Sequence, residues 1–239
     1  MFRHSLEFRQ PLRHPLKLQP GYRFNSKVLE KMTAIVLFAL LTGCSGAGVS
    51  DVNRYMDRVL GYEMADMISN NRLDPMRVAP YHTKLGAPGT LSAEMRIVNI
   101  TGLKQIRRQG DCSGPRTSGP FQTTISCNAV IDNVAVSATS DLSYMRTASR
   151  PIGTRADFDT IRVHVEVTST LRKPTTVNPI LLGTPSLRVS FFVGLEQFPP
   201  DSVIRKGYEQ ELSGLLEERL REVYLLNLVT ACRAVPFPY

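Results

Sequence analysis

The segment close to the C-terminus constrains the fold most, because it predicts one unusually long amphipathic helix. After Pro199-Pro200, residues 201–230 carry apolar side chains at helical spacing. Thirty helical residues would span about 45 Å, which exceeds the average globular helix. A helix of this length needs an equally long partner surface, and a curved sheet wrapped along it would supply one. The stripe comprises Ile204, Tyr208, Leu212, Leu215, Leu216, Leu220, Val223 and Tyr224.

The middle of the chain has the alternation expected of antiparallel β-structure. In the segment 161–167, Val163 and Val165 alternate with charged or polar residues, which predicts one buried and one solvated face. A further strand is expected over 187–195, after a linker punctuated by Pro174, Pro179 and Pro185. Asp132-Asn133 is a candidate two-residue turn between two other strands.

An amphipathic helix is predicted before the strands. Ser50 or Asp51 is a suitable N-cap, and the helical spacing continues to about Asn71. Its apolar stripe is rich in methionine, the side chain best able to line an irregular apolar cavity. The order of helix, run of strands and long helix predicts an α+β fold rather than a parallel βαβ fold.

A leader is predicted before this helix. Ala34–Leu41 is an unbroken apolar run, too short to span a bilayer but suited to a secretory signal of about 7–15 apolar residues. Met32 is a suitable start for such a signal, with cleavage expected within Gly46–Val49. An alternative is a bacterial lipobox at Leu41–Cys44, in which Cys44 would be acylated. We therefore expect a leader over 1–48, a single domain over 49–232 and a tail over 233–239.

The net charge of +8 does not indicate a nucleic-acid partner. Residues 1–46 hold seven of the 29 basic and two of the 21 acidic residues, which leaves 22 basic against 19 acidic in the remainder. Nucleic-acid-binding domains usually carry their positive charge on the folded part. We expect no such partner.

The cysteines favour an oxidising compartment. Cys112 and Cys127 flank a Gly/Pro-rich turn, as a disulfide that ties two strands would. Cys232 is left over, either as a buried thiol or as half of an intermolecular bridge. Asn99-Ile100-Thr101 is an N-glycosylation triplet, so Asn99 is the candidate acceptor. The remaining cysteines and histidines fit no zinc pattern, and we expect no metal.

No catalytic motif or cofactor motif is evident. The chain has no Gly-rich phosphate loop, Gly-x-Ser-x-Gly elbow or His-Glu-x-x-His. His164 falls on the solvated face of a predicted strand, and His82 in a polar loop beside Tyr81 and Thr83. Glu217-Glu218 lies on the polar face of the last helix. We therefore expect no enzyme, no catalytic residue and no cofactor.

Four phrases carry a resemblance to a known family. Leu73–Val78 (Leu-Asp-Pro-Met-Arg-Val) follows the first helix, and Glu94-Met95-Arg96 leads into Gly102–Asp111, with Asp141–Tyr144 further on. In this order they resemble the group-seven mite allergens. The resemblance covers roughly Val52 to Thr230 and is specific only in 73–111. The pair Cys112 and Cys127 and the loop between them depart from it.

The resemblance implies a curved antiparallel sheet wrapped around the C-terminal helix. That fold is similar to one half of the bactericidal/permeability-increasing and lipopolysaccharide-binding proteins. Its wider group includes insect juvenile-hormone carriers and takeout-like proteins, and it holds lipids in an apolar groove between sheet and helix. The resemblance also suggests an arthropod source.

Two hypotheses of function follow. The first is a secreted, extracellular, non-enzymatic protein that binds a lipid or another hydrophobic small molecule between sheet and helix. The second is a secreted structural or interaction protein whose core is filled and holds no ligand. Under the first, the ligand-lining residues are Met56, Val59, Met67, Val163, Val165, Phe191, Val193, Ile204, Tyr208, Leu212, Leu215, Leu216 and Leu220.

A basic turn adds a narrower hypothesis. Lys104, Arg107 and Arg108 cluster at the end of a predicted strand. They are candidates for contact with anionic lipid headgroups or bacterial lipid, as in innate-immune recognition, through peripheral contact with lipid surfaces.

Overall fold

The structure is a computed structural model that describes residues 48–86, 91–119, 121–144, 148–170, 173–192 and 201–238. All of them fall within one compact unit, Gly46–Tyr239. Except for Gly48, the predicted leader lies outside the described residues, and so does Val193 of the predicted lining set. The predicted boundaries of leader, domain and tail therefore stay predictions.

The first helix begins at Val49 and ends at Asn70, close to the predicted limits. It consists of α2 (Val49–Arg58), the π-helical turn η1 (Val59–Glu63) and α3 (Met64–Asn70). The carboxylate of Asp51 accepts a hydrogen bond from the backbone N–H of Gly48 at 3.2 Å. The predicted apolar stripe is buried, while Met67 is half-buried.

Six of the described strands form one sheet, sheet A, in which every pairing is antiparallel. Its order is β1-β3-β7-β8-β11, with β2 also paired to β3. Because β1 and β2 pair with opposite halves of β3, together they form one edge of the sheet, and β11 forms the other. The strands are β1 (Met76–Val78), β2 (Tyr81–Leu85), β3 (Leu91–Thr101), β7 (Ala135–Tyr144), β8 (Arg150–Phe158) and β11 (Leu187–Phe191). Tyr81 and His82 thus lie in a strand, so their prediction as a loop is wrong: main-chain pairing to β3 holds this polar segment extended.

Five further strands form sheet B. Its order is β10-β9-β6-β4, with β5 paired to β6. The predicted strand at 161–167 is confirmed within β9, and its valines are buried. The predicted proline linker is wrong, because Pro174 and Pro179 lie inside β10, an edge strand, where a missing N–H is tolerated. The strands are β4 (Ile106–Arg108), β5 (Arg116–Thr117), β6 (Gln122–Ile131), β9 (Ile161–Thr170) and β10 (Lys173–Leu181).

The predicted two-residue hairpin turn at Asp132-Asn133 is also wrong. β6 pairs with β9 and β4, whereas β7 pairs with β3 and β8, so neither has an edge free for the other. The two residues instead carry the chain from sheet B to sheet A. Asn133 has a φ of 57°, the left-handed conformation that asparagine tolerates better than most residues.

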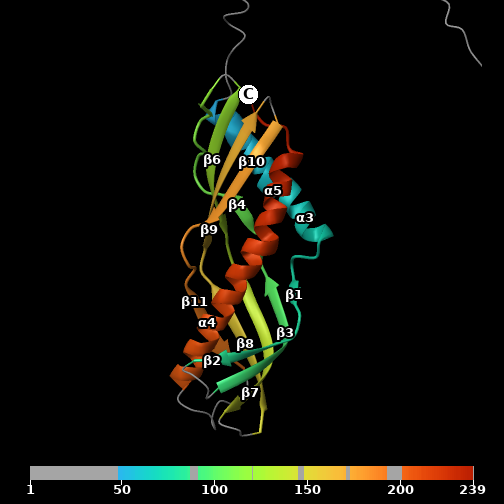
Figure 1. Cartoon of the computed structure of the whole chain (residues 1–239), viewed down its shortest axis with the longest axis vertical. Helices are drawn as coiled ribbons and strands as arrows, with labels where there is room; N and C mark the ends of the chain where they lie inside the picture. The colour runs from blue at the N-terminus through green and yellow to red at the C-terminus, as the bar shows by residue number, and fades with distance from the viewer. Residues whose placement is uncertain are drawn as a thin grey trace, which may run out of the picture. The chain divides into compact units, whose positions relative to one another are not determined.

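The C-terminal helix runs along both sheets (Figure 1). It comprises α4 (Asp201–Arg219), the π-helical turn η2 (Leu220–Tyr224) and α5 (Leu225–Ala234), about 50 Å at 1.5 Å per residue. α4 lies against β2 and β11, the two edges of sheet A, while α5 packs on β10 and on the first helix. The predicted α+β class, with antiparallel sheet structure around a long C-terminal helix, is confirmed.

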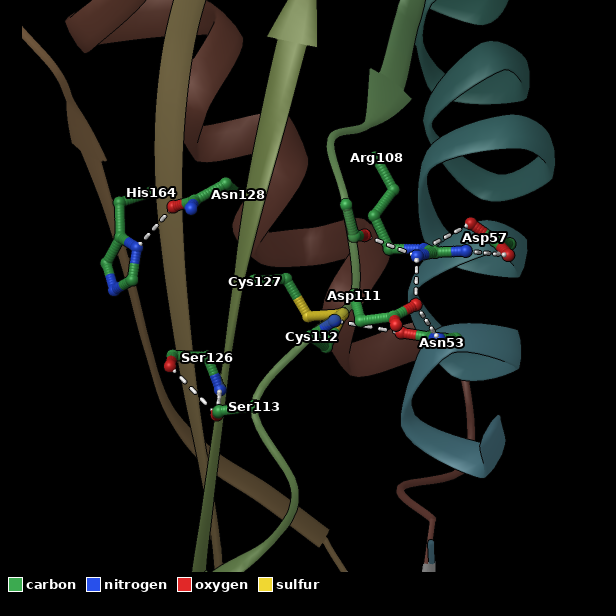
Figure 2. The surroundings of a disulfide bond; sticks show 11 residues. Asn53, Asp57, Arg108, Asp111, Cys112, Ser113, Ser126, Cys127, Asn128 and His164 are labelled. Carbon is green, nitrogen blue, oxygen red and sulfur yellow. Dashed lines mark hydrogen bonds and ion pairs between the residues drawn. A yellow bond between two sulfur atoms is a disulfide. The ribbon is translucent and has the colours of Figure 1, made fainter. Parts of the chain in front are cut away.

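The predicted disulfide between Cys112 and Cys127 is confirmed (Figure 2). It ties the segment after β4 to β6 across a sequence separation of 15, which stabilises the fold by about 3 kcal/mol in the chain-entropy model. Cys232 is a buried free thiol. The tail packs against the first helix, because Val235 and Phe237 are buried and the rings of Phe237 and Tyr55 lie 5.7 Å apart.

Candidate ligand-binding clefts

Two of the four phrases, Leu73–Val78 and Gly102–Asp111, meet at one carboxylate. Asp74 accepts hydrogen bonds from the backbone N–H groups of Gly102 and Lys104, at 3.1 and 3.0 Å. Tyr224 of η2 donates its hydroxyl proton to the carbonyl oxygen of Leu103 at 2.8 Å. The turn 102–104 is therefore fixed between the end of the first helix and the middle of the last.

Two of the three predicted headgroup cations already have carboxylate partners. Arg108 forms a two-pronged pair with Asp57 of α2, at 2.8 and 3.0 Å (Figure 2), and this hydrogen bonding raises the pKa of Arg108. Arg107 binds Asp132 at 2.8 and 3.0 Å. Only the Lys104 side chain of this set lines a cleft described below. Contact of the basic turn with anionic lipid stays a prediction.

The predicted lining residues lie in a filled core. Met56, Val59, Val163, Val165, Ile204, Tyr208, Leu212 and Leu216 have no exposed surface, and Leu215 and Leu220 have 7% and 1%. A side chain beside a void large enough for water would have accessible surface, so no such void adjoins the first eight. Met67 and Phe191 are half-buried. A ligand would reach these residues only if the helix and sheet moved apart, and their role in binding stays a prediction.

A cleft of about 850 Å³ opens between α4 and the β2 edge of sheet A. We call it the seam cleft; its walls are residues 78–84 with Gly86, and the helix face carrying Gly207, Gln210, Glu211, Gly214, Leu215, Glu218 and Arg219. A Cβ on Gly207 would lie 2.9 Å from Leu85 Cβ, so helix and strand touch there. At Gly214, two turns later, a Cβ would meet nothing within 4 Å. Helix and strand therefore diverge along the cleft.

The hydroxyl of Tyr81 is the unusual group in the seam cleft. Its oxygen is buried and has no hydrogen-bond partner among the described residues. Burial, and then the charge of nearby Glu211, raises the pKa of Tyr81. The Glu211 carboxylate accepts the Thr83 hydroxyl at 2.7 Å and makes no well-formed hydrogen bond with Tyr81. A buried hydroxyl left unpaired costs about 1–3 kcal/mol, which a ligand with a polar atom at this point would recover.

We expect opposite results from removing two tyrosine hydroxyls. Tyr81→Phe should leave the free energy of unfolding unchanged or raise it by up to about 1 kcal/mol, because it removes an unpaired buried group. Tyr224→Phe should lower the free energy of unfolding by about 1–3 kcal/mol, because the substitution leaves the buried carbonyl oxygen of Leu103 without its hydrogen-bond donor. Urea denaturation of both variants checks this. Equal destabilisation would show that Tyr81 is hydrogen-bonded in the folded protein.

A second cleft, of about 650 Å³, lies further along the same helix face and shares Arg219 with the first. We call it the cationic cleft. Its apolar surface comes from Leu73, Met76 and Val223. Its charged side chains are Arg72, Asp74, Arg77, Lys104 and Arg219. Of the residues predicted from sequence as sites, this cleft contains Lys104 and the seam cleft contains Leu215; the others line neither.

The histidines and acidic residues form no catalytic arrangement in the described part of the chain. His164 shares a hydrogen bond of 2.8 Å with Asn128 on the surface of sheet B, and His82 is exposed in the seam cleft. Glu217 is paired with Arg221 at 2.8 Å. No three His, Cys, Asp or Glu side chains among the described residues gather as a metal site. None of the described helices has the length and apolarity to cross a membrane.

Comparison with known proteins identifies no family by sequence: no family model and no curated protein matches the chain. Among solved structures, it is similar to a lipopolysaccharide binding protein, with 11% identity and a TM-score of 0.35 over 76% of this chain and 40% of that one. It is also similar to Takeout 1 of Epiphyas postvittana, with 12% identity and a TM-score of 0.33 over 76% of this chain and 92% of that one. The chain thus spans less than half the length of the first.

Proposed function

We propose that this protein binds a lipid or similar amphiphile without catalysis, and that the ligand enters at the seam cleft. The observation that carries this is the divergence of α4 from the sheet edge between Gly207 and Gly214, above an apolar core. The volume of about 850 Å³ lies within the usual range of small-molecule sites, roughly 300–1,000 Å³.

The two sides of α4 are held unequally, which supports opening at the seam. On the β11 side, Arg205 donates a hydrogen bond to the carbonyl of Val189, and its guanidinium lies 5.4 Å from the ring centre of Phe191. Phe191 in turn packs edge-on against Tyr208 at 5.4 Å. On the β2 side, the Thr83–Glu211 hydrogen bond spans the cleft, and the Tyr81 hydroxyl in its wall has no hydrogen-bond partner among the described residues. Separation at β2 would uncover Leu212 and Leu216 to a ligand tail.

The energy available from such a tail is sufficient. Each CH₂ group moved from water into this core would contribute about 0.8 kcal/mol, so a chain of ten or more carbons would offset the partial separation of helix and sheet. The disulfide supports an extracellular site of action, because such bonds persist in oxidising compartments. Membership of the group-seven mite allergen-like family, an arthropod source and recognition of bacterial lipid belong to the same proposal.

A specific observation favours a second candidate function. The eight fully buried residues of the predicted lining set adjoin no void that would admit a ligand without movement of the helix. A secreted structural or interaction protein with a filled core would have this packing without further explanation. The two candidates differ in whether the core opens.

Substitution at Gly214 tests the proposal. Gly214→Leu should fill the seam cleft and lower the affinity for a fluorescent fatty-acid probe at least about tenfold. It should leave the fold intact, because nothing lies within 4 Å of a Cβ at this position. Gly61→Leu is the matched control: Gly61 is also exposed on a helical segment with nothing within 4 Å, and it lines neither cleft. Mass spectrometry of an organic extract of protein from its natural source would show whether lipid co-purifies. No lipid and no probe binding would favour the structural candidate, whereas binding unaffected by Gly214→Leu would place the ligand elsewhere.

A further inference from the structure

The cationic cleft differs from the seam cleft in its charge. Arg72, Arg77, Lys104 and Arg219 line it, against the single carboxylate of Asp74. The seam cleft is balanced, since Lys84 and Arg219 there face Glu211 and Glu218. The helix face therefore presents a neutral cleft beside one whose lining has a net charge of +3.

Three of the four cations in the cationic cleft have no carboxylate partner among the described residues, and the fourth, Arg219, has only long ion pairs. Asp74 already accepts the backbone N–H groups of Gly102 and Lys104. No side chain of Arg72, Arg77 or Lys104 lies within ion-pair distance of a carboxylate in the described part of the chain. Arg219 reaches Glu218 and Glu222 only at 3.6 and 3.7 Å, and its buried Nε has no hydrogen-bond partner among the described residues. Gathering these cations costs Coulomb energy that a bound anion would remove.

The backbone of Arg72 indicates that its charge has a use. Arg72, two residues beyond the end of α3, has the left-handed conformation, with φ of 53°, and the N–H of Leu73 donates to the carbonyl oxygen of Ile68 at 2.9 Å. Glycine is the usual residue at this position of a helix end, because it adopts positive φ without strain. An arginine here gives up stability, and it adds a guanidinium to the cleft.

The apolar residues of the cleft define the rest of the ligand. Leu73 and Met76 are buried at 5% and 6% exposure, and Val223 is half-buried on the helix. A free inorganic anion would gain nothing from contact with this apolar surface. An amphiphile would bury its first methylene groups there, because they follow directly behind the oxyanion.

We propose that the cationic cleft binds the oxyanion head, carboxylate or phosphate, of an amphiphile whose tail occupies the seam cleft. This inference rests on the proposed function and adds the head-group class and the direction of the ligand. Arg72 and Arg77 are suited to two-pronged contacts with an oxyanion, and Lys104 contributes a point charge. Arg219, which lines both clefts, marks where head and tail join.

Two ligands that differ only in the head test this. Titrations of the full chain with hexadecanoate and with hexadecanol should show tighter binding of the acid. Arg77→Gln/Lys104→Gln should weaken binding of the acid at least about tenfold and leave that of the alcohol unchanged. Arg116→Gln/Arg162→Gln is the matched control, because it removes two exposed cations that line neither cleft. It should change neither affinity.

The outcomes separate this inference from the proposed function. Binding of acid and alcohol with equal affinity, unchanged in Arg77→Gln/Lys104→Gln, would overturn the head site while the lipid-binding function stands. Binding of neither ligand would overturn both. Tight binding of inorganic phosphate alone, with no gain from a chain, would show a free-anion site and overturn the proposal. Equal loss of acid and alcohol in the double variant would show a structural effect and overturn it as well.

Discussion

Replacing Gly102 with alanine is expected to lower the free energy of unfolding by at least about 3 kcal/mol, the range of severe steric and backbone defects. A Cβ at this position would lie 2.3 Å from the carbonyl oxygen of Asn133 and 3.1 Å from the Cα of Val134. Both are backbone atoms at the crossing between the sheets, so neither can rotate away. The residue also has a φ of 89°, which alanine rarely adopts. Urea denaturation followed by circular dichroism measures the loss.

A second glycine separates the clash from the backbone strain. Gly110 has a φ of 69° but nothing within 4 Å of an added Cβ. Gly110→Ala should therefore cost only about 1 kcal/mol, the usual penalty of a left-handed alanine. Equal losses in the two variants would show that Gly102 is required only for its φ. A much larger loss for Gly102→Ala would establish the close approach of the turn to the sheet crossing.

This position also explains why the segments Leu73–Val78 and Gly102–Asp111 occur together in the sequence. The turn that begins at Gly102 presents two N–H groups to Asp74 and one carbonyl oxygen to Tyr224. It thereby joins the first helix, both sheets and the last helix at one point. The phrases are thus parts of one structural junction, and the Lys104 side chain that projects from it lines the cationic cleft.

The elements were predictable because their signals are local. Apolar residues recur every 3.6 residues in a helix and every 2 residues in a strand, so each pattern can be recognised within one segment. These patterns located both helices and strand β9. The division into two sheets was not predictable, because it depends on which strand occupies each neighbouring edge. Pro174 and Pro179 read as a linker for the same reason: an edge strand and a linker differ only in their partners.

The clefts were harder to predict than the core. Apolar spacing identifies the residues that face inward, but a lined groove and a filled core share that pattern. Tyr81 and Arg72 carry no periodic signal, since one lies in a short polar strand and the other just beyond a helix end. One signal was available. Gly207 and Gly214 are two helical turns apart on the same face, which indicates a side where α4 has little side-chain cover.

Alkaline pH is expected to unfold the protein through its buried acids. Burial raises the pKa of Tyr55 and Tyr224 well above their ordinary value, and raises that of Cys232 from 9.0 to about 12. In the unfolded chain these groups ionise at their ordinary values, whereas in the folded protein they keep their protons. Their stabilising contribution is therefore complete below about pH 9 and falls as the pH rises from there towards the folded values.

The expected loss is large compared with the stability of a domain. Each such group lowers the free energy of unfolding by about 1.4 kcal/mol for every pH unit above its ordinary pKa. The three groups together therefore lower it by about 5 kcal/mol at pH 11. Tyr81 and Tyr208, whose pKa values are also raised by burial, add to this loss. Typical total stabilities are about 5–15 kcal/mol, so unfolding at moderate alkalinity is expected. Urea midpoints measured from about pH 8 to pH 11 would record the decline.

Cys232→Ala tests the assignment directly. It should reduce the loss between about pH 9 and pH 11 by nearly 3 kcal/mol, because the thiol would lie about two pH units above its ordinary pKa at the end of that range. The variant also removes a thiolate that would attack the Cys112–Cys127 disulfide once the chain unfolds. A pH dependence unchanged by Cys232→Ala would show that the thiol is not held neutral in the core. Stability that stays flat to about pH 11 would show that water reaches the buried tyrosines, as an opened core between helix and sheet would allow.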